Sequence, residues 1–245
     1  MNVEKLQKAK KTLLKRIEDG RGRGHGADYV PLYKANDAKS TGTASMIPDI
    51  WAGRTVHTLS TVETDLYYLL RWNPNVKEIR EQIPLNMDLV NVIRKELKLP
   101  RVAKDTVYTS DFLVTYKDDS TPHVFSVKYS DRKFNPHDIA YRGNENNFRK
   151  LMNRQYIEQI YWEWHGCQFD IVTREDINHL LVSNIRFVLG FCKPEKIVNR
   201  EQKLMYLIAH RYVAAPMDQK PLRPKELIET ADFDIDELFE EVTKK

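Results

Sequence analysis

The sequence predicts an α/β fold for residues 1–172 and a smaller, mostly helical domain for residues 173–245. Strand-like segments alternate with helical patterns as far as "QFDIVT" at residues 168–173, which is typical of a sheet flanked by helices. Beyond that point the strand signal fades, and helical patterns broken by prolines follow. No run of about 18 apolar residues exists, so the sequence predicts no membrane-spanning helix.

The N-terminal part combines a basic helix, a glycine-rich segment and an irregular stretch. "KLQKAKKTLLKRIEDG" (residues 5–20) has helical character and ends at a glycine. "GRGRGHG" (residues 20–26) has four glycines in seven residues, which favours either a flexible segment or a close approach of the backbone. Residues 27–56 show no regular period, and we expect irregular structure there.

A helix and a strand are predicted next. "STVETDLYYLLRW" (residues 60–72) opens with Ser60 and has Glu63 three residues later, the capping-box pattern that precedes an apolar helical stripe. "VKEIREQIPL" (residues 76–85) alternates and ends near a proline, as a strand does. The following residues 86–106 are expected to form an excursion that is partly helical.

The centre of the sequence predicts a β-hairpin followed by a long helix. "SDFLVTYKDDSTPHVFSVKY" (residues 110–129) contains two strand-like runs joined by "KDDSTP", a turn by composition. "NNFRKLMNRQYIEQIYWEWHG" (residues 146–166) has the length and the terminal glycine of a helix. The remaining strand is residues 168–173, after which the helical domain begins.

Composition and charge indicate a globular protein of a reducing compartment. The chain is 41% hydrophobic and 30% charged, and its two cysteines, Cys167 and Cys192, are too few for a disulfide scaffold. The N-terminus lacks the apolar core of a signal peptide, so we expect a cytoplasmic location. The net charge is +4, with a basic stretch at residues 1–25 and an acidic one at residues 229–241. The two ends either meet different partners or present solvated helix faces.

The predicted hairpin places three polar side chains at one end of two paired strands. Side chains two residues apart in a strand share a face, so Asp111, Ser126 and Lys128 converge if the faces align. Many nucleases place an aspartate ahead of an acid-x-lysine triplet, and Ser126 stands here where the acid would be. A carboxylate suits Mg²⁺, and a lysine beside it can orient water or neutralise charge on a phosphate. A hairpin without catalytic function remains the alternative.

Glu63 also has two interpretations. In a capping box its carboxylate would accept a hydrogen bond from the Ser60 amide and stabilise the helix by about 1 kcal/mol. Alternatively, it projects toward the end of the sheet and supplies a second carboxylate to the site.

The chain resembles the TnsA-type endonuclease subunits of heteromeric cut-and-paste transposases. The similar stretches occur in family order over most of residues 16–178 and are "RIEDGRGRGHGADYVP", "GRTVHTLSTVETDLYYLLRW", "VKEIREQIPL", "TSDFLV", "FSVKY" and "YWEWHGCQFDIVTREDI". The resemblance implies a restriction-endonuclease-like mixed sheet flanked by helices in residues 1–172. It also implies that residues 173–245 dock a partner, with a winged helix as one candidate form of that domain.

The resemblance further implies a role for each residue of the site. Glu63 and Asp111 match the family's catalytic glutamate and metal-binding aspartate, and Lys128 matches its catalytic lysine. The family carries glutamine where this chain has Ser126, and the main-chain carbonyl of Val127 is the expected remaining metal ligand. The implied cofactor is Mg²⁺, for which Mn²⁺ can substitute.

The implied partners are double-stranded DNA at transposon ends and two proteins. A TnsB-like DDE transposase would cut and join the 3′ ends while this subunit cuts near the 5′ ends. A TnsC-like ATPase regulator would contact the C-terminal domain. The setting implied is the bacterial cytoplasm, in association with the nucleoid and not with a membrane.

Three further residues are candidates for DNA contacts. Arg54 and His57 precede the predicted helix that carries Glu63, and either they touch a phosphate or they are solvent-facing loop residues. Arg80 shares a predicted strand face with Gln82, and the two either approach the site or form a buried polar pair.

Two other functions remain open from the sequence. One is a stand-alone nuclease, such as a restriction enzyme or a junction resolvase. The other is an assembly subunit whose nuclease site has decayed and which docks the transposase to its ATPase. The serine at position 126 motivates this second alternative.

Overall fold

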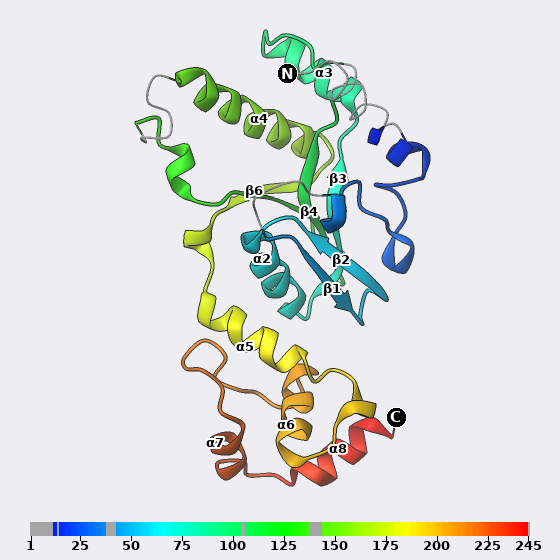
Figure 1. Cartoon of the computed structure of the whole chain (residues 1–245), viewed down its shortest axis with the longest axis vertical. Helices are drawn as coiled ribbons and strands as arrows, with labels where there is room; N and C mark the ends of the chain where they lie inside the picture. The colour runs from blue at the N-terminus through cyan, green and yellow to red at the C-terminus, as the bar shows by residue number, and fades with distance from the viewer. Residues whose placement is uncertain (1–11, 14, 38–42, 104–105, 138–143, 245) are drawn as a thin grey trace. The chain divides into compact units, whose positions relative to one another are not determined.

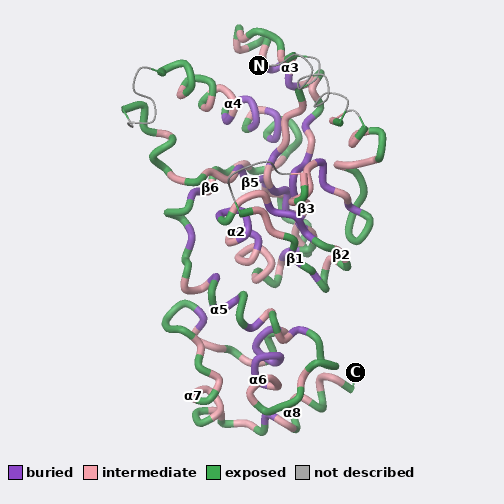
Figure 2. The backbone as a smooth tube through the Cα atoms, viewed as in Figure 1, coloured by how far each residue is buried: buried purple, intermediate pink, exposed green. Residues whose placement is uncertain are grey.

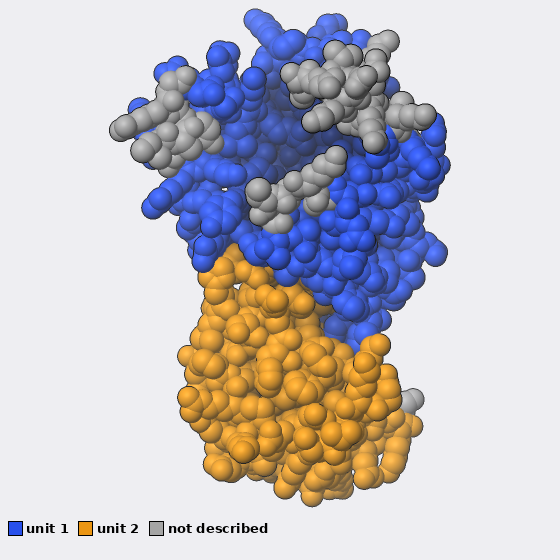
Figure 3. Space-filling view, in the orientation of Figure 1, with its two compact units in different colours: residues 1–64, 73–176 blue, residues 65–72, 177–245 orange. Residues whose placement is uncertain are grey.

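The chain forms two compact units (Figure 3). Unit 1 comprises residues 1–64 and 73–176, and unit 2 comprises residues 65–72 and 177–245. The computed structural model describes residues 12–13, 15–37, 43–103, 106–137 and 144–244. Half of the predicted basic helix lies outside the described residues, and residues 12–13 and 15–18 are helical.

Unit 1 is built on a four-stranded mixed sheet (Figure 1). Its strands, in spatial order, are β3 (Val76–Pro84), β4 (Thr109–Tyr116), β5 (His123–Val127) and β6 (Gln168–Val172). The first three are antiparallel neighbours, and β6 runs parallel to β5. The predicted strand, hairpin and final strand are therefore present, and with the flanking helices they form the predicted mixed α/β fold.

Two helices and the apolar side chains of the strands form the core of unit 1. The helices are α3 (Met87–Glu96), in the predicted excursion, and α4 (Glu145–Trp164), the predicted long helix. Their side chains pack against Leu113 of β4 and Val124 of β5, and Tyr161 and Trp162 of α4 belong to the same cluster. Buried residues therefore concentrate where the helices meet the strands, as Figure 2 shows.

A small second sheet occupies part of the stretch predicted to be irregular. It pairs β1 (Ser45–Asp49) with β2 (Arg54–Thr58) in antiparallel register. The expectation of irregular structure at residues 27–56 is therefore wrong for residues 45–49 and 54–56. Pro48 lies within β1, and a proline inside a run argues against a strand when only the sequence is considered.

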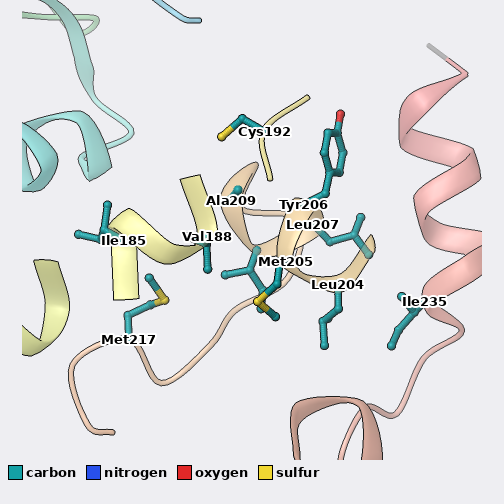
Figure 4. Close-up of a cluster of buried hydrophobic side chains, with 11 residues drawn as sticks. Ile185, Val188, Cys192, Leu204, Met205, Tyr206, Leu207, Ala209, Met217 and Ile235 are labelled. Atoms are coloured by element: carbon teal, nitrogen blue, oxygen red, sulfur yellow. The ribbon is translucent and has the colours of Figure 1, made fainter. Parts of the chain in front are cut away.

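The regular secondary structure in the described residues of unit 2 consists of helices alone, joined by loops. The unit contains α5 (His179–Leu189), α6 (Arg200–Ala209), α7 (Pro224–Glu229) and α8 (Ile235–Thr243), together with residues 65–72 of α2 (Thr61–Trp72). The helix α6 is central, because its residues 204–209 are all buried and the other helices pack against it (Figure 4). No strand occurs in residues 177–244, so the candidate winged helix is not confirmed.

Short 3₁₀ helices connect several of these elements. They are η1 (Gly26–Asp28), η2 (Ala35–Asp37), η3 (Asp131–Phe134), η5 (Arg174–Asp176) and η6 (Pro194–Lys196). Within the described part of the chain, every helix is too short or too polar to cross a bilayer.

The glycine-rich segment lies along β3 as a strap, which we define as residues 20–32. Gly26 donates its amide to the Glu78 carboxylate at 2.6 Å, and Tyr29 donates its hydroxyl to the main-chain oxygen of Glu81 at 2.7 Å. All four glycines have positive φ, between 54° and 91°. Of the two alternatives, the structure thus shows the close approach, which Figure 1 draws in blue beside β3.

Gly22 is the point of closest approach and leads to a first prediction. A Cβ at this position would lie 2.3 Å from the Cγ atom of Pro84, whereas a Cβ at Gly20 would meet nothing within 4 Å. The two glycines have nearly equal φ, +79° and +78°. We expect Gly20→Ala to lower the free energy of unfolding by about 1–2 kcal/mol, the cost of a left-handed alanine. Gly22→Ala should cost about 1–3 kcal/mol more, because the added methyl group overlaps the proline.

Urea denaturation followed by tryptophan fluorescence measures both variants against the unchanged chain. Equal losses of unfolding free energy in Gly20→Ala and Gly22→Ala would show that Gly22 does not lie in close contact with Pro84 of β3.

Candidate active site

The first turn of α2 fixes the position of Glu63. Ser60 Oγ accepts a hydrogen bond from the Glu63 amide at 3.2 Å and donates to Glu63 Oε1 at 2.9 Å. The other carboxylate oxygen accepts from the amide of Leu59, not of Ser60, at 2.9 Å. A capping interaction is therefore present with one partner shifted, and it holds the carboxylate in a single orientation.

The hairpin brings Asp111 and Lys128 together as its alternation predicts. Asp111 Oδ2 accepts a 2.6 Å hydrogen bond from the amide of Val127 and lies 3.9 Å from the ammonium nitrogen of Lys128. The same ammonium donates to the main-chain oxygen of Val127 at 2.9 Å. An acid, a main-chain carbonyl and an amine thus converge at the end of β5.

Ser126 lies beside the lysine. Its hydroxyl accepts a 2.8 Å hydrogen bond from Lys128 Nζ, and the residue is only 1% exposed. In this arrangement Ser126 orients the lysine, and a part in metal binding stays a prediction.

Gln82 joins the helix and the hairpin. Its amide nitrogen donates to Glu63 Oε2 at 3.4 Å and to Asp111 Oδ1 at 3.2 Å. Because this nitrogen reaches both groups, the two carboxylates face one small volume even though 47 residues separate them in the sequence. The structure thus brings Glu63, Asp111 and Lys128 together in unit 1.

The shared volume has a negative potential that affects protonation. Burial, and next the charge of Asp111, raise the pKa of Glu63 to about 7. The same two causes, in the same order, raise the pKa of Glu158 to about 7. Glu158 lies on α4 and accepts a 2.6 Å hydrogen bond from the hydroxyl of Ser110, the neighbour of Asp111. A cation placed between Glu63 and Asp111 would offset their repulsion.

The donor set fits a hard divalent cation of the Mg²⁺ type. In the described part of the chain, no cluster of three or more His, Cys, Asp or Glu side chains is placed to hold a metal ion, so a site here has at most two acidic ligands. Mg²⁺ commonly uses one or two carboxylates and completes its shell with water and phosphate oxygens. Glu63, Asp111 and the main-chain oxygen of Val127 offer that minimum, since all three carry oxygen donors at the same end of the sheet.

The structure does not support a DNA contact for Arg54. Its guanidinium forms two 2.7 Å hydrogen bonds with the carboxylate of Glu81, and the two side chains are only 7% and 0% exposed. It also donates to the main-chain oxygen of Ile79 at 2.8 Å. This arginine neutralises a buried acid of β3, which sequence analysis could not pair with it across 27 positions.

His57 and Arg80 are also placed differently from the prediction. His57 is buried in β2, and its ring nitrogen Nδ1 accepts a hydrogen bond from the amide of Ala35 at 3.3 Å. Burial lowers the pKa of His57, so the ring carries no charge to attract a phosphate at neutral pH. Arg80 lies 3.5 Å from the Glu78 carboxylate, which is the partner of the strap. Neither placement supports the predicted contact with DNA.

The sequence of this chain is similar to known proteins of one kind. A family described as "TnsA-like endonuclease N terminal" matches residues 73–174, a range that includes Asp111 and Lys128. The transposon Tn7 transposition protein TnsA of Escherichia coli is 30% identical to this chain over 188 residues. That alignment covers 76% of this chain and 64% of the relative, so the chain spans less than two thirds of the relative's length.

The buried pair of Arg54 and Glu81 gives a second prediction. We expect Arg54→Met to lower the free energy of unfolding by about 3–5 kcal/mol, because it leaves a buried carboxylate without its counter-charge. Lys77→Met is the control in the same unit, since Lys77 makes only an exposed 3.9 Å ion pair with Asp119. It should cost less than about 1 kcal/mol.

Urea denaturation measures both effects, and a gel-shift assay with duplex DNA measures binding. Unchanged stability of Arg54→Met together with weakened DNA binding would restore the predicted phosphate contact.

Proposed function

We propose that this chain, which is similar to a TnsA-like endonuclease family over residues 73–174 and to a transposition protein TnsA, is a metal-dependent DNA endonuclease subunit of a transposase. One observation supports this most strongly. Glu63 and Asp111 lie within hydrogen-bonding distance of one amide group, and Lys128 lies 3.9 Å from Asp111. The reaction is hydrolysis of a phosphodiester bond near the 5′ ends of a transposon.

The roles of the residues follow from their contacts. Glu63, Asp111 and the main-chain oxygen of Val127 would hold Mg²⁺, or Mn²⁺ in its place. When bound, the ion supplies Lewis acidity toward the phosphate and the attacking water. Lys128 carries a positive charge to the same point and stabilises the negative charge that develops on the phosphate oxygens. Ser126 keeps that ammonium in place.

The partners proposed are those of a two-subunit transposase. A TnsB-like DDE transposase would process the 3′ ends of the same element, and a TnsC-like ATPase regulator would dock on residues 173–245. The substrate is double-stranded DNA at transposon ends, in the bacterial cytoplasm and at the nucleoid.

A second candidate function has an observation in its favour. Position 126 provides a buried hydroxyl that is hydrogen-bonded to Lys128 and provides no carboxylate. An assembly subunit with a decayed nuclease site would need no third acid. Such a protein would dock the transposase to its ATPase without binding Mn²⁺.

The main proposal is tested by removing the acid or the amine while keeping side-chain size. Asp111→Asn and Lys128→Met should each lower the rate of 5′-end cleavage at least about 100-fold, because several kcal/mol of transition-state stabilisation are lost. The matched controls are Asp119→Asn and Lys117→Met, in the exposed turn after β4. They should cleave like the unchanged chain.

The assay uses labelled transposon-end DNA, Mg²⁺ and a TnsB-like DDE transposase. Cleavage at the unchanged rate by either site variant would refute the assignment. Cleavage of plain DNA without the transposase would indicate the stand-alone nuclease instead.

A further prediction separates a lysine-positioning role of Ser126 from a role in metal binding. Ser126→Ala removes one hydrogen bond to the ammonium, so cleavage should slow about tenfold, which corresponds to about 1.4 kcal/mol. Mn²⁺ affinity, measured by calorimetry, should stay unchanged. Ser130→Ala, in the exposed segment after β5, is the control. A loss of Mn²⁺ affinity in Ser126→Ala alone would identify the serine as a ligand.

A further inference from the structure

Gln82 is the one described side chain that donates hydrogen bonds to both Glu63 and Asp111. It is 3% exposed, and its amide oxygen accepts a hydrogen bond from the hydroxyl of Thr109 at 3.4 Å. Both ends of the amide are therefore engaged, and the carboxylates, which only accept hydrogen bonds when ionised, determine that the nitrogen end faces them.

Gln82 lies beside the site in an unusual backbone conformation. Its φ is +50°, a left-handed conformation that non-glycine residues adopt rarely. Glu81, Gln82 and Ile83 are all buried, so both faces of β3 are covered at this point. The sheet register places Glu81 opposite Phe112 and Ile83 opposite Ser110, so Gln82 lies level with Asp111.

The glycine strap holds this conformation in place. The amide of Leu32 donates to the main-chain oxygen of Gln82 at 3.3 Å, and the hydroxyl of Tyr29 donates to that of Glu81 at 2.7 Å. Two consecutive carbonyls of β3 thus accept hydrogen bonds from the strap. Unusual backbone persists where the surrounding structure determines it in this way, and such positions occur often at functional sites.

The chemistry of an amide suits this place. A lysine or arginine between the two carboxylates would neutralise them and compete with a metal ion for the same charge. An amide donates two hydrogen bonds but carries no net charge, so the negative potential remains available to a cation. Ser126 is engaged with Lys128 and cannot take this part.

We propose that Gln82 is a positioning residue, whose amide holds Glu63 and Asp111 in the orientation that a divalent cation requires. This inference rests on the proposed metal-dependent nuclease function. Partners that orient metal ligands typically contribute a factor of about 10 to 100 in metal affinity. The same loss of orientation lowers kcat and leaves the KM for DNA unchanged, because Gln82 is buried away from the DNA surface.

Two variants separate the amide from the backbone. Gln82→Leu keeps the approximate size and removes both hydrogen bonds. Gln82→Gly also removes them but adopts positive φ without strain, so it tests the amide in a relaxed backbone. Gln155→Leu is the matched control, because Gln155 is another buried glutamine of unit 1, on α4, and contacts neither carboxylate.

The experiment is titration calorimetry of the full chain with Mn²⁺, with folding checked by circular dichroism. We expect Gln82→Leu and Gln82→Gly to bind Mn²⁺ about 10- to 100-fold more weakly than the unchanged chain, and Gln155→Leu to bind normally. Single-turnover cleavage should fall in kcat for the two Gln82 variants at constant KM. Asp111→Asn gives the baseline for a lost ligand.

The outcomes distinguish this inference from the proposed function. Folded Gln82 variants that bind Mn²⁺ within about twofold of the unchanged chain would overturn the positioning role, while Asp111-dependent binding would leave the nuclease proposal standing. An unchanged chain that binds no Mn²⁺ would overturn both.

Discussion

The close approach of two carboxylates is the constraint on which the rest of unit 1 depends. Glu63 and Asp111 repel each other, and burial adds to the cost of charging Glu63. Glu63 is therefore held by neutral donors, Leu59 and Ser60. Asp111 accepts a hydrogen bond from the amide of Val127, and its one nearby counter-charge among the described residues is the Lys128 ammonium at 3.9 Å. Main-chain amides and hydroxyls stabilise a carboxylate without cancelling its charge. The site keeps a negative potential that a cation can use.

Glu81, another buried acid of unit 1, has a cationic partner, in contrast to the space between Glu63 and Asp111. Glu81 precedes Gln82 in β3, is fully buried and receives the bidentate guanidinium of Arg54. An acid neutralised in this way costs little to bury and attracts no metal ion. Glu81 and Glu63, both buried in unit 1, thus have different roles: Glu81 belongs to a neutral buried pair, whereas Glu63 keeps its capacity to bind a cation. The difference is that an arginine pairs with Glu81, whereas an uncharged amide lies between Glu63 and Asp111.

Local patterns predicted most elements and the acid and amine groups, because those signals lie within short stretches. The Ser60-x-x-Glu63 pattern specifies a helix start, and alternation in the hairpin specifies which side chains meet. The pairing of Arg54 with Glu81 is different, since it joins β2 to β3 across 27 residues and has no periodic signature. Gln82 approaches the site, which is one of the two alternatives that the sequence leaves open, but its contacts with both Glu63 and Asp111 join three distant segments and have no sequence signature.

The glycine-rich strap connects the motif "GRGRGHG" (residues 20–26) with the chemistry of the site. Its glycines are required by positive φ, and Gly22 also by the closeness of Pro84. What this close approach achieves is two hydrogen bonds, from Tyr29 and Leu32, to consecutive carbonyls of β3. Those bonds brace β3 at Gln82, where φ is positive. Because the Gln82 amide contacts Glu63 and Asp111, a motif with no catalytic atoms supports the residue that orients the acids.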